Sequence, residues 1–150
     1  VKYPNDARVK VYNMNKESSR IFTYVIICFI VSCNMTTAYI DNPKICTSLT
    51  DTKCNIDIRV INTITSDIFA SCDLKNATEN TEVFFKWYYY GQQEVLIDSV
   101  SLSSGNNIGT LNLQSSLSKP TNGWPKGKYK VLINIVGFDK EPIIKEFTIE

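Results

Sequence analysis

The five cysteines have the most distinctive chemistry in this chain, because thiols can bind metals, form disulfides or carry lipid. They are Cys28, Cys33, Cys46, Cys54 and Cys72. No two of them are spaced as Cys-x-x-Cys, and the chain has no histidine, so we expect no metal site. Cys46 and Cys54 flank a short polar segment, which favours a local disulfide and leaves Cys72 as a buried thiol.

The remaining polar residues show no spacing that supports catalysis. A Ser-His-Asp triad needs histidine, and no serine lies in a Gly-x-Ser-x-Gly turn. The sequence also lacks a glycine-rich phosphate loop and a calcium-loop pattern, and no spacing of its carboxylates suggests a glycosidase pair. We therefore expect a protein that is not an enzyme and that has no cofactor.

The uncharged segment IFTYVIICFIVSC, residues 21–33, bears on the location of the chain. Its strongly apolar part ends at residue 31, so it is shorter than the roughly 20 residues of a transmembrane helix. Reading from Met14, a basic stretch, an apolar stretch and small residues follow one another in the order of a secretory signal.

The end of this segment, Ile30-Val31-Ser32-Cys33, resembles the lipobox of bacterial lipoproteins. In that family the cysteine receives a diacylglyceryl group and the chain is cut directly before it. The resemblance implies a lipoprotein signal peptide over residues 14–32 and lipidation at Cys33. An uncleaved membrane anchor is the alternative. We interpret residues 1–13 as an upstream extension, or else as a long cytoplasmic region.

Charge is distributed unevenly along the chain. Residues 1–20 carry five basic and two acidic side chains, whereas residues 34–150 carry 11 basic and 13 acidic ones. A basic head before a mildly acidic body favours a body that crosses the membrane. We expect an extracytoplasmic location, with the membrane as a partner through the N-terminal lipid or anchor. The body has no basic stripe, so we expect no nucleic-acid partner.

From residue 55 onward, short β-rich segments alternate with turns rich in Gly, Pro, Asn and Ser. Their spacing predicts seven strands in an all-β sandwich or barrel. The segments are 56–61, 67–74, 82–90, 94–102, 108–114, 128–136 and 143–149. Alternation predicts three inward rows. The rows are Ile68, Ala70, Cys72 and Leu74, opposite Ser71 and Asp73; Val83, Phe85, Trp87 and Tyr89; and Tyr129, Val131, Ile133 and Ile135.

Four of these positions have immunoglobulin-like spacing. Cys72 precedes Trp87 by 15 residues, and Tyr129 stands two residues before Val131. This spacing resembles the immunoglobulin frame, with Val131 in place of the second cysteine. The wider pattern FFKWYYYGQ … GWPKGKYKVLINIVG … KEFTI is similar to immunoglobulin-like domains of bacterial and archaeal surface lipoproteins. The resemblance implies a seven-stranded antiparallel β-sandwich over residues 54–150, with these four residues in its core and no inter-sheet disulfide.

Three aromatic residues are candidates for ligand binding. Tyr88 and Tyr90 lie on the strand face opposite Trp87, and Trp124 lies in a loop. Exposed aromatic rings can stack on sugars or anchor a protein partner. The competing interpretation gives them scaffold roles, with Trp124 covering the end of the sandwich.

These observations together predict a non-catalytic cell-surface lipoprotein. Residues 33–53 form a lipid-anchored flexible lead, and the domain that follows mediates protein interaction or envelope assembly. The partner is an envelope protein or a glycan. The alternatives are a carbohydrate-binding module that uses the exposed aromatics and a protease-inhibitor-like module.

Overall fold

A computed structural model describes residues 38–150 of the chain. The expected features at residues 1–32, and the expected lipidation site Cys33, lie outside this range. The described part contains eight β-strands and no helix. They are β1 (Tyr39–Cys46), β2 (Val60–Ile61), β3 (Asp67–Ala77), β4 (Glu82–Tyr90), β5 (Glu94–Ser103), β6 (Gly109–Ser118), β7 (Gly127–Ile135) and β8 (Ile143–Ile149). Accordingly, no helix that could cross a membrane is found among residues 38–150.

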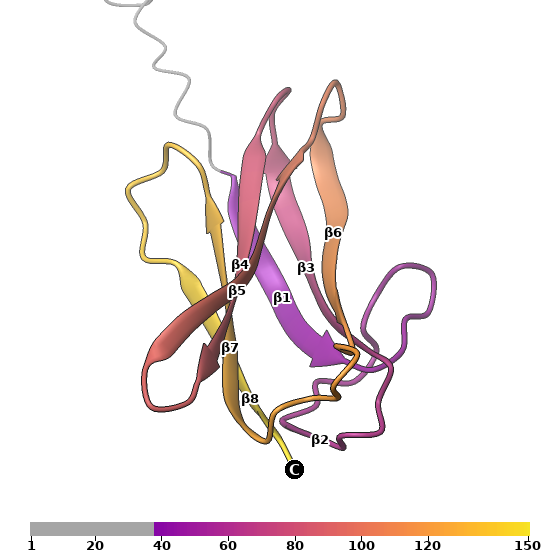
Figure 1. The fold of residues 1–150 in the computed structure, drawn as a ribbon. Coiled ribbons are helices and arrows are strands. Elements are labelled where there is room, and N and C mark those ends of the chain that lie inside the picture. The colour runs from indigo at the N-terminus through magenta and orange to yellow at the C-terminus, as the bar shows by residue number, and fades with distance from the viewer. Residues whose placement is uncertain (1–37) are drawn as a thin grey trace, which may run out of the picture. The chain divides into compact units, whose positions relative to one another are not determined.

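The strands form two sheets that pack as a β-sandwich-like fold (Figure 1). One sheet has the order β1-β3-β6, and the other has the order β2-β8-β7-β4-β5. Neighbours are antiparallel except for β2, which runs parallel to β8. The prediction of an all-β fold is therefore confirmed.

Alternating side chains from the two sheets fill the core between them. In β4, Val83, Phe85 and Trp87 are fully buried, and β7 contributes a matching row. The Trp87 indole N–H donates a hydrogen bond to the Ser115 hydroxyl of β6 at 2.9 Å. This buried bond joins the two sheets, so it ties the layers together at a point where no disulfide does.

Strand β3 differs from the simple alternation that the sequence predicts. Its inward residues are buried as expected, but Ser71 and Asp73 on the opposite face are also buried. The loop after β1 covers that face, where the Cys54 N–H donates to the Ser71 hydroxyl and Lys53 forms an ion pair with Asp73. Asp73 therefore has polar partners in place of water.

The prediction of a flexible lead is wrong for residues 39–53. Residues 39–46 form β1, an edge strand paired with β3, and Ile45 is fully buried. Asn42 adopts a positive φ of 50° before Pro43, and the register shifts between Asp41 and Lys44. This irregularity interrupts the alternation, and for that reason the sequence pattern does not reveal the strand.

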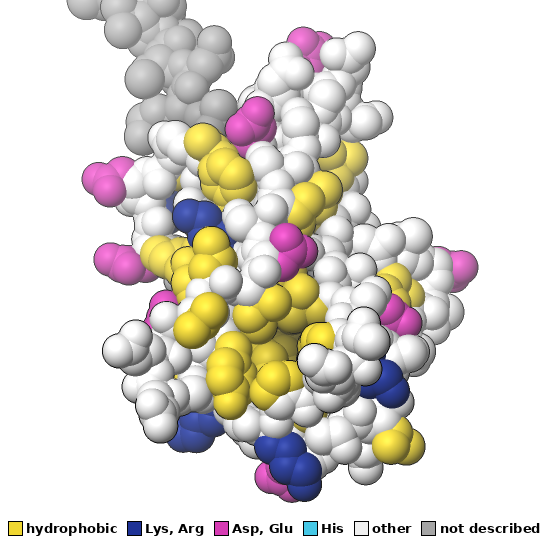
Figure 2. All heavy atoms as spheres, viewed as in Figure 1, with side chains coloured by type: hydrophobic (Ala, Val, Ile, Leu, Met, Phe, Trp, Pro, Cys, Tyr) yellow, Lys and Arg dark blue, Asp and Glu magenta, His cyan; other side chains and the backbone are white. Residues whose placement is uncertain are grey.

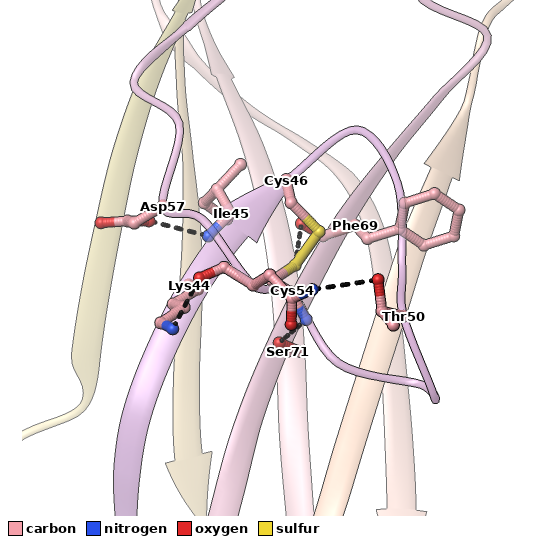
Figure 3. Close-up of a disulfide and its surroundings, with 9 residues drawn as sticks. Lys44, Ile45, Cys46, Thr50, Cys54, Asp57, Phe69 and Ser71 are labelled. Carbon is pink, nitrogen blue, oxygen red and sulfur yellow. Dashed lines mark hydrogen bonds between the residues drawn. A yellow bond between two sulfur atoms is a disulfide. The ribbon is translucent and has the colours of Figure 1, made fainter.

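A disulfide joins Cys46 at the end of β1 to Cys54, as the sequence predicts (Figure 3). The strand expected at residues 56–61 is mostly wrong, because only residues 60–61 belong to a strand. Asp57 instead accepts a hydrogen bond from the Ile45 N–H and forms an ion pair with Lys145. Burial alone would raise the pKa of Asp57, but these bonds hold it below its usual value.

Candidate binding sites

The structure separates Trp124 from the two tyrosines with which the sequence grouped it. Its side chain is buried, and its indole N–H donates to the Thr65 carbonyl at 2.7 Å. The ring stands edge-on to Tyr129 at a centroid distance of 6.4 Å. Trp124 is therefore not exposed, and its main role is packing, as the scaffold interpretation has it; a role in ligand binding stays a prediction.

Tyr88 and Tyr90 lie together on the outer face of the five-stranded sheet, around Lys130 of β7. The Lys130 ammonium is 5.0 Å from the centroid of the Tyr88 ring and 4.8 Å from that of Tyr90. It also forms an ion pair with Glu94 at 2.9 Å. Hydrogen bonding to Tyr90 and Glu94 raises the pKa of Lys130. Each ring thus turns a face toward an ammonium, and that face is not free to stack on a sugar.

A polar hollow of about 440 Å³ lies beside Tyr90. Its lining includes Arg59, Lys128, Glu146 and Thr148. No described carboxylate forms an ion pair with Arg59 or Lys128, so two cations line the hollow beside an aromatic ring, together with the single carboxylate of Glu146. This arrangement suits a small polar or anionic ligand.

An apolar groove of about 270 Å³ lies between β5 and the loop that joins β6 to β7. Its lining is Tyr89, Val95, Ile97, Pro120, Trp124, Pro125 and Tyr129. Figure 2 shows hydrophobic side chains gathered on this face, over the lower part of β5 and beside that loop. Val95, Leu96 and Ile97 are 54%, 51% and 44% exposed, although all three are apolar and consecutive. Exposed apolar runs of this kind mark interaction sites.

Tyr89 forms one wall of the groove, and the backbone of the loop that joins β6 to β7 holds this side chain in place. The Tyr89 hydroxyl donates to the Lys126 carbonyl at 3.2 Å, and its ring packs on Tyr129 at 5.0 Å. Gly127 has a φ of 147°, and a Cβ there would lie 3.0 Å from the Tyr89 ring. Glycine is therefore required where the loop enters β7.

The edge of β5 that borders the groove is open. Within residues 38–150, β5 pairs with β4 alone, so the backbone groups on its other side meet no strand. The pairing contains a bulge, since Asp98 faces Trp87 while Leu96 faces Tyr88, which leaves Ile97 as the extra residue. Groove and open edge thus form one continuous surface.

Two groups of side chains among the described residues can be checked for metal or thiol chemistry. No group of three or more acidic or cysteine side chains in this range could hold a metal. Burial, assisted by the nearby Asp73 carboxylate, raises the pKa of the Cys72 thiol to about 12, so it is protonated and inert at neutral pH. The four expected core residues Cys72, Trp87, Tyr129 and Val131 are all buried.

The sequence interpretation missed the groove, although one signal was present. The run Val95-Leu96-Ile97 breaks the alternation expected of a half-buried strand, because three neighbouring residues are apolar. Such a run in an edge strand leaves apolar side chains in water, whichever face is buried. What the sequence cannot supply is the opposite wall at Trp124 and Pro125, which comes from a distant loop.

No protein-family model and no curated protein matches the chain. Among solved structures, it is similar to the Pseudomonas fluorescens alkylpurine DNA glycosylase AlkC bound to DNA containing an abasic site analog. The two share 16% identity with a TM-score of 0.43, over 75% of this chain and 30% of that chain. The chain thus spans less than a third of that protein, and so distant a similarity is not informative about function.

Proposed function

We propose that this chain is a membrane-anchored, non-catalytic binding module that engages a protein through the groove beside β5. The observation that carries this proposal is the exposed run Val95-Leu96-Ile97 on an open strand edge. Edge strands in soluble proteins are usually protected by charge, proline or short length. A ten-residue edge with an apolar run and an adjoining groove is the arrangement that binds an added strand.

Three features of the fold support an immunoglobulin-like frame for this module. The short strand β2 runs parallel to β8 while the other neighbours are antiparallel. Trp87 is buried in β4, and the Tyr129 hydroxyl donates to the Pro125 carbonyl four residues upstream at 2.7 Å. A tyrosine that bonds to the backbone just upstream is typical of the corner before strand F in that frame. Val131 occupies the position of the missing cysteine.

An extracytoplasmic location fits the disulfide and the N-terminal sequence. The Cys46–Cys54 bridge is of a type that persists in oxidising compartments. A lipid on Cys33, or a retained anchor helix, would hold the module at a membrane surface. Its partner would then be a protein of the cell envelope.

Two measurements test this proposal. The intact mass of the chain from the membrane fraction should include a diacylglyceryl group, which Cys33→Ala removes. A photo-reactive residue at position 95 should cross-link to protein in intact cells, whereas one at the exposed position 108 should not. Equal cross-linking at the two positions would contradict a docking role for the groove.

The polar hollow beside Tyr90 favours a second candidate function, the binding of a small polar or acidic saccharide. Arg59 and Lys128 supply cations there for an acidic saccharide. The Tyr90 ring also lines the hollow, although one of its faces is turned toward Lys130. Titration with uronic-acid oligosaccharides, followed by amide chemical shifts, should perturb Lys128 and Thr148 if this function holds. Lys128→Ala should weaken the binding, and unchanged spectra would remove the candidate.

A further inference from the structure

The structure points to a second copy of this chain as the partner that pairs with β5, edge to edge and antiparallel, about a twofold axis. This inference rests on the proposed function of the groove, and it names the occupant. A twofold pairing is isologous, so the same surface must complement itself. Whether β5 can do so depends on its register, and the bulge determines the register.

The bulge at Ile97 changes which residues of β5 face the core. Before it, Val95 faces inward, opposite Tyr89, and Leu96 faces outward, opposite Tyr88. After it, Val100 and Leu102 face inward and pack against the core. Inward positions are therefore odd-numbered before the bulge and even-numbered after it.

Residues directly opposite each other in an antiparallel pair point to the same side of the sheet. When β5 pairs with β5 of a second copy, residues before the bulge in one copy lie opposite residues after the bulge in the other. An inward residue with an odd number must therefore face an inward residue with an even number, so the two numbers differ in parity. The register that pairs Glu94 with Ser103 spans all ten residues of β5 and satisfies this condition at every pair outside the bulge. Its facing pairs are Glu94 with Ser103, Val95 with Leu102, Leu96 with Ser101, and Ile97 with Val100. At the bulge, Asp98 shares with Ile97 the place opposite Val100, so that Ser99 faces Ser99 of the second copy at the twofold axis.

This register also places the acidic residues of β5 favourably. Glu94 and Asp98 are the two charged residues of the strand, and neither faces an acidic residue of the second copy, because Glu94 faces Ser103 and Asp98 lies beside Ile97 opposite Val100. The shorter register that pairs residues 94–98 with themselves would place Glu94 opposite Asp98 and expose them to like-charge repulsion. The full-length register instead sets apolar side chains against apolar ones at Val95 and Ile97, the exposed residues that line the groove.

The test is a pair of engineered cysteines in the full chain. Leu96 and Ser101 face outward and are exposed, and the proposed register brings each opposite the other in the second copy. Directly opposite residues lie about 4.5–5.5 Å apart between Cα atoms, which suits a disulfide. The double variant Leu96→Cys, Ser101→Cys should therefore form a reducible dimer at micromolar concentration under mild oxidation.

The two single variants are matched controls for the register. In either one, the introduced cysteine lies five residues along the strand from its counterpart, about 17 Å away, so little dimer should form. The unsubstituted chain measures any background from Cys28 and Cys33, while Cys72 is buried and does not compete. Cleavage before Asp98 separates positions 96 and 101, so the linked peptides identify the register.

A second measurement does not depend on cysteine chemistry. Sedimentation of the full chain in mild detergent should show a dimer whose dissociation constant rises at least tenfold in Ile97→Lys. Ile108→Lys, a matched change at a more exposed position outside the groove, should leave that constant unchanged. A monomer at all concentrations, together with cross-linking no better in the double variant than in the single ones, would overturn the second copy as partner. If position 95 then still cross-linked to a different protein, the proposed function would stand; without any adduct there, both would fail.

Discussion

The hydrogen bond between Trp87 and Ser115 gives a direct test of how the two sheets are held together. Trp87 has no exposed surface and Ser115 is 8% exposed, so water does not replace either partner freely. Ser115→Ala removes the acceptor and leaves the indole N–H buried without a partner. A buried donor left unsatisfied costs about 1–3 kcal/mol, so the free energy of unfolding should fall by about that amount.

The assay is urea denaturation of the full chain, followed by circular dichroism. Ser116→Ala is the matched control, because Ser116 is the exposed neighbour on the same strand. Trp87→Phe destabilises by leaving a cavity, but it also removes the donor. In the Trp87→Phe background, Ser115→Ala should therefore lower the free energy of unfolding much less. The double-mutant cycle formed by these variants isolates the contribution of the hydrogen bond.

Two results would refute this reasoning. The first is a Ser115→Ala variant whose stability lies within about 0.5 kcal/mol of Ser116→Ala, the range expected of a neutral surface change. The second is an equal loss in the Trp87→Phe background, which would mean that the serine acts through something other than the indole.

Three further predictions concern titration and thiol chemistry. The lowered pKa of Asp57 contributes stability that is present above about pH 4 and is lost as the pH falls through the folded-state pKa. Asp57→Asn should thus flatten the acid limb of a plot of unfolding free energy against pH, and an unchanged limb would contradict the ion pair with Lys145. A thiol reagent at pH 8 should modify Cys72 only in urea, and rapid labelling of the native chain would show that the thiol is accessible. Cys54→Ser should lower the unfolding free energy by about 2–3 kcal/mol, because it opens the loop closed by Cys46; an unchanged urea midpoint would contradict this.

The sequence predicted the central strands well, because their hydrophobic pattern follows from their own burial. Trp87 in β4 and Val131 in β7 lie in rows of alternating residues that face one core, so period-two alternation is enough to identify them. The Cys46–Cys54 disulfide was predictable for a similar local reason, since only a short loop separates the two thiols.

The features that the sequence did not reveal depend on contacts between distant segments. β1 carries Asn42 and Pro43 at its irregularity, so only its pairing with β3 identifies it as a strand. The loop that the disulfide closes buries the outward face of β3, and no local sequence pattern indicates this burial. The sequence left open whether Trp124 is exposed in its loop or covers the end of the sandwich, because its hydrogen-bond partner, the Thr65 carbonyl, is 59 residues away in the chain.

The position of β8 has a consequence for the timing of folding. β8 comes last in sequence among the described strands, but it lies inside the five-stranded sheet, between β7 and β2. Val60 of β2 therefore cannot pair until its partner in β8, Thr148, has been synthesised. The sheet cannot be completed until residues 143–149 have left the ribosome, so this domain remains incompletely folded until that point of synthesis. A chain in that state can still be threaded through a translocation channel.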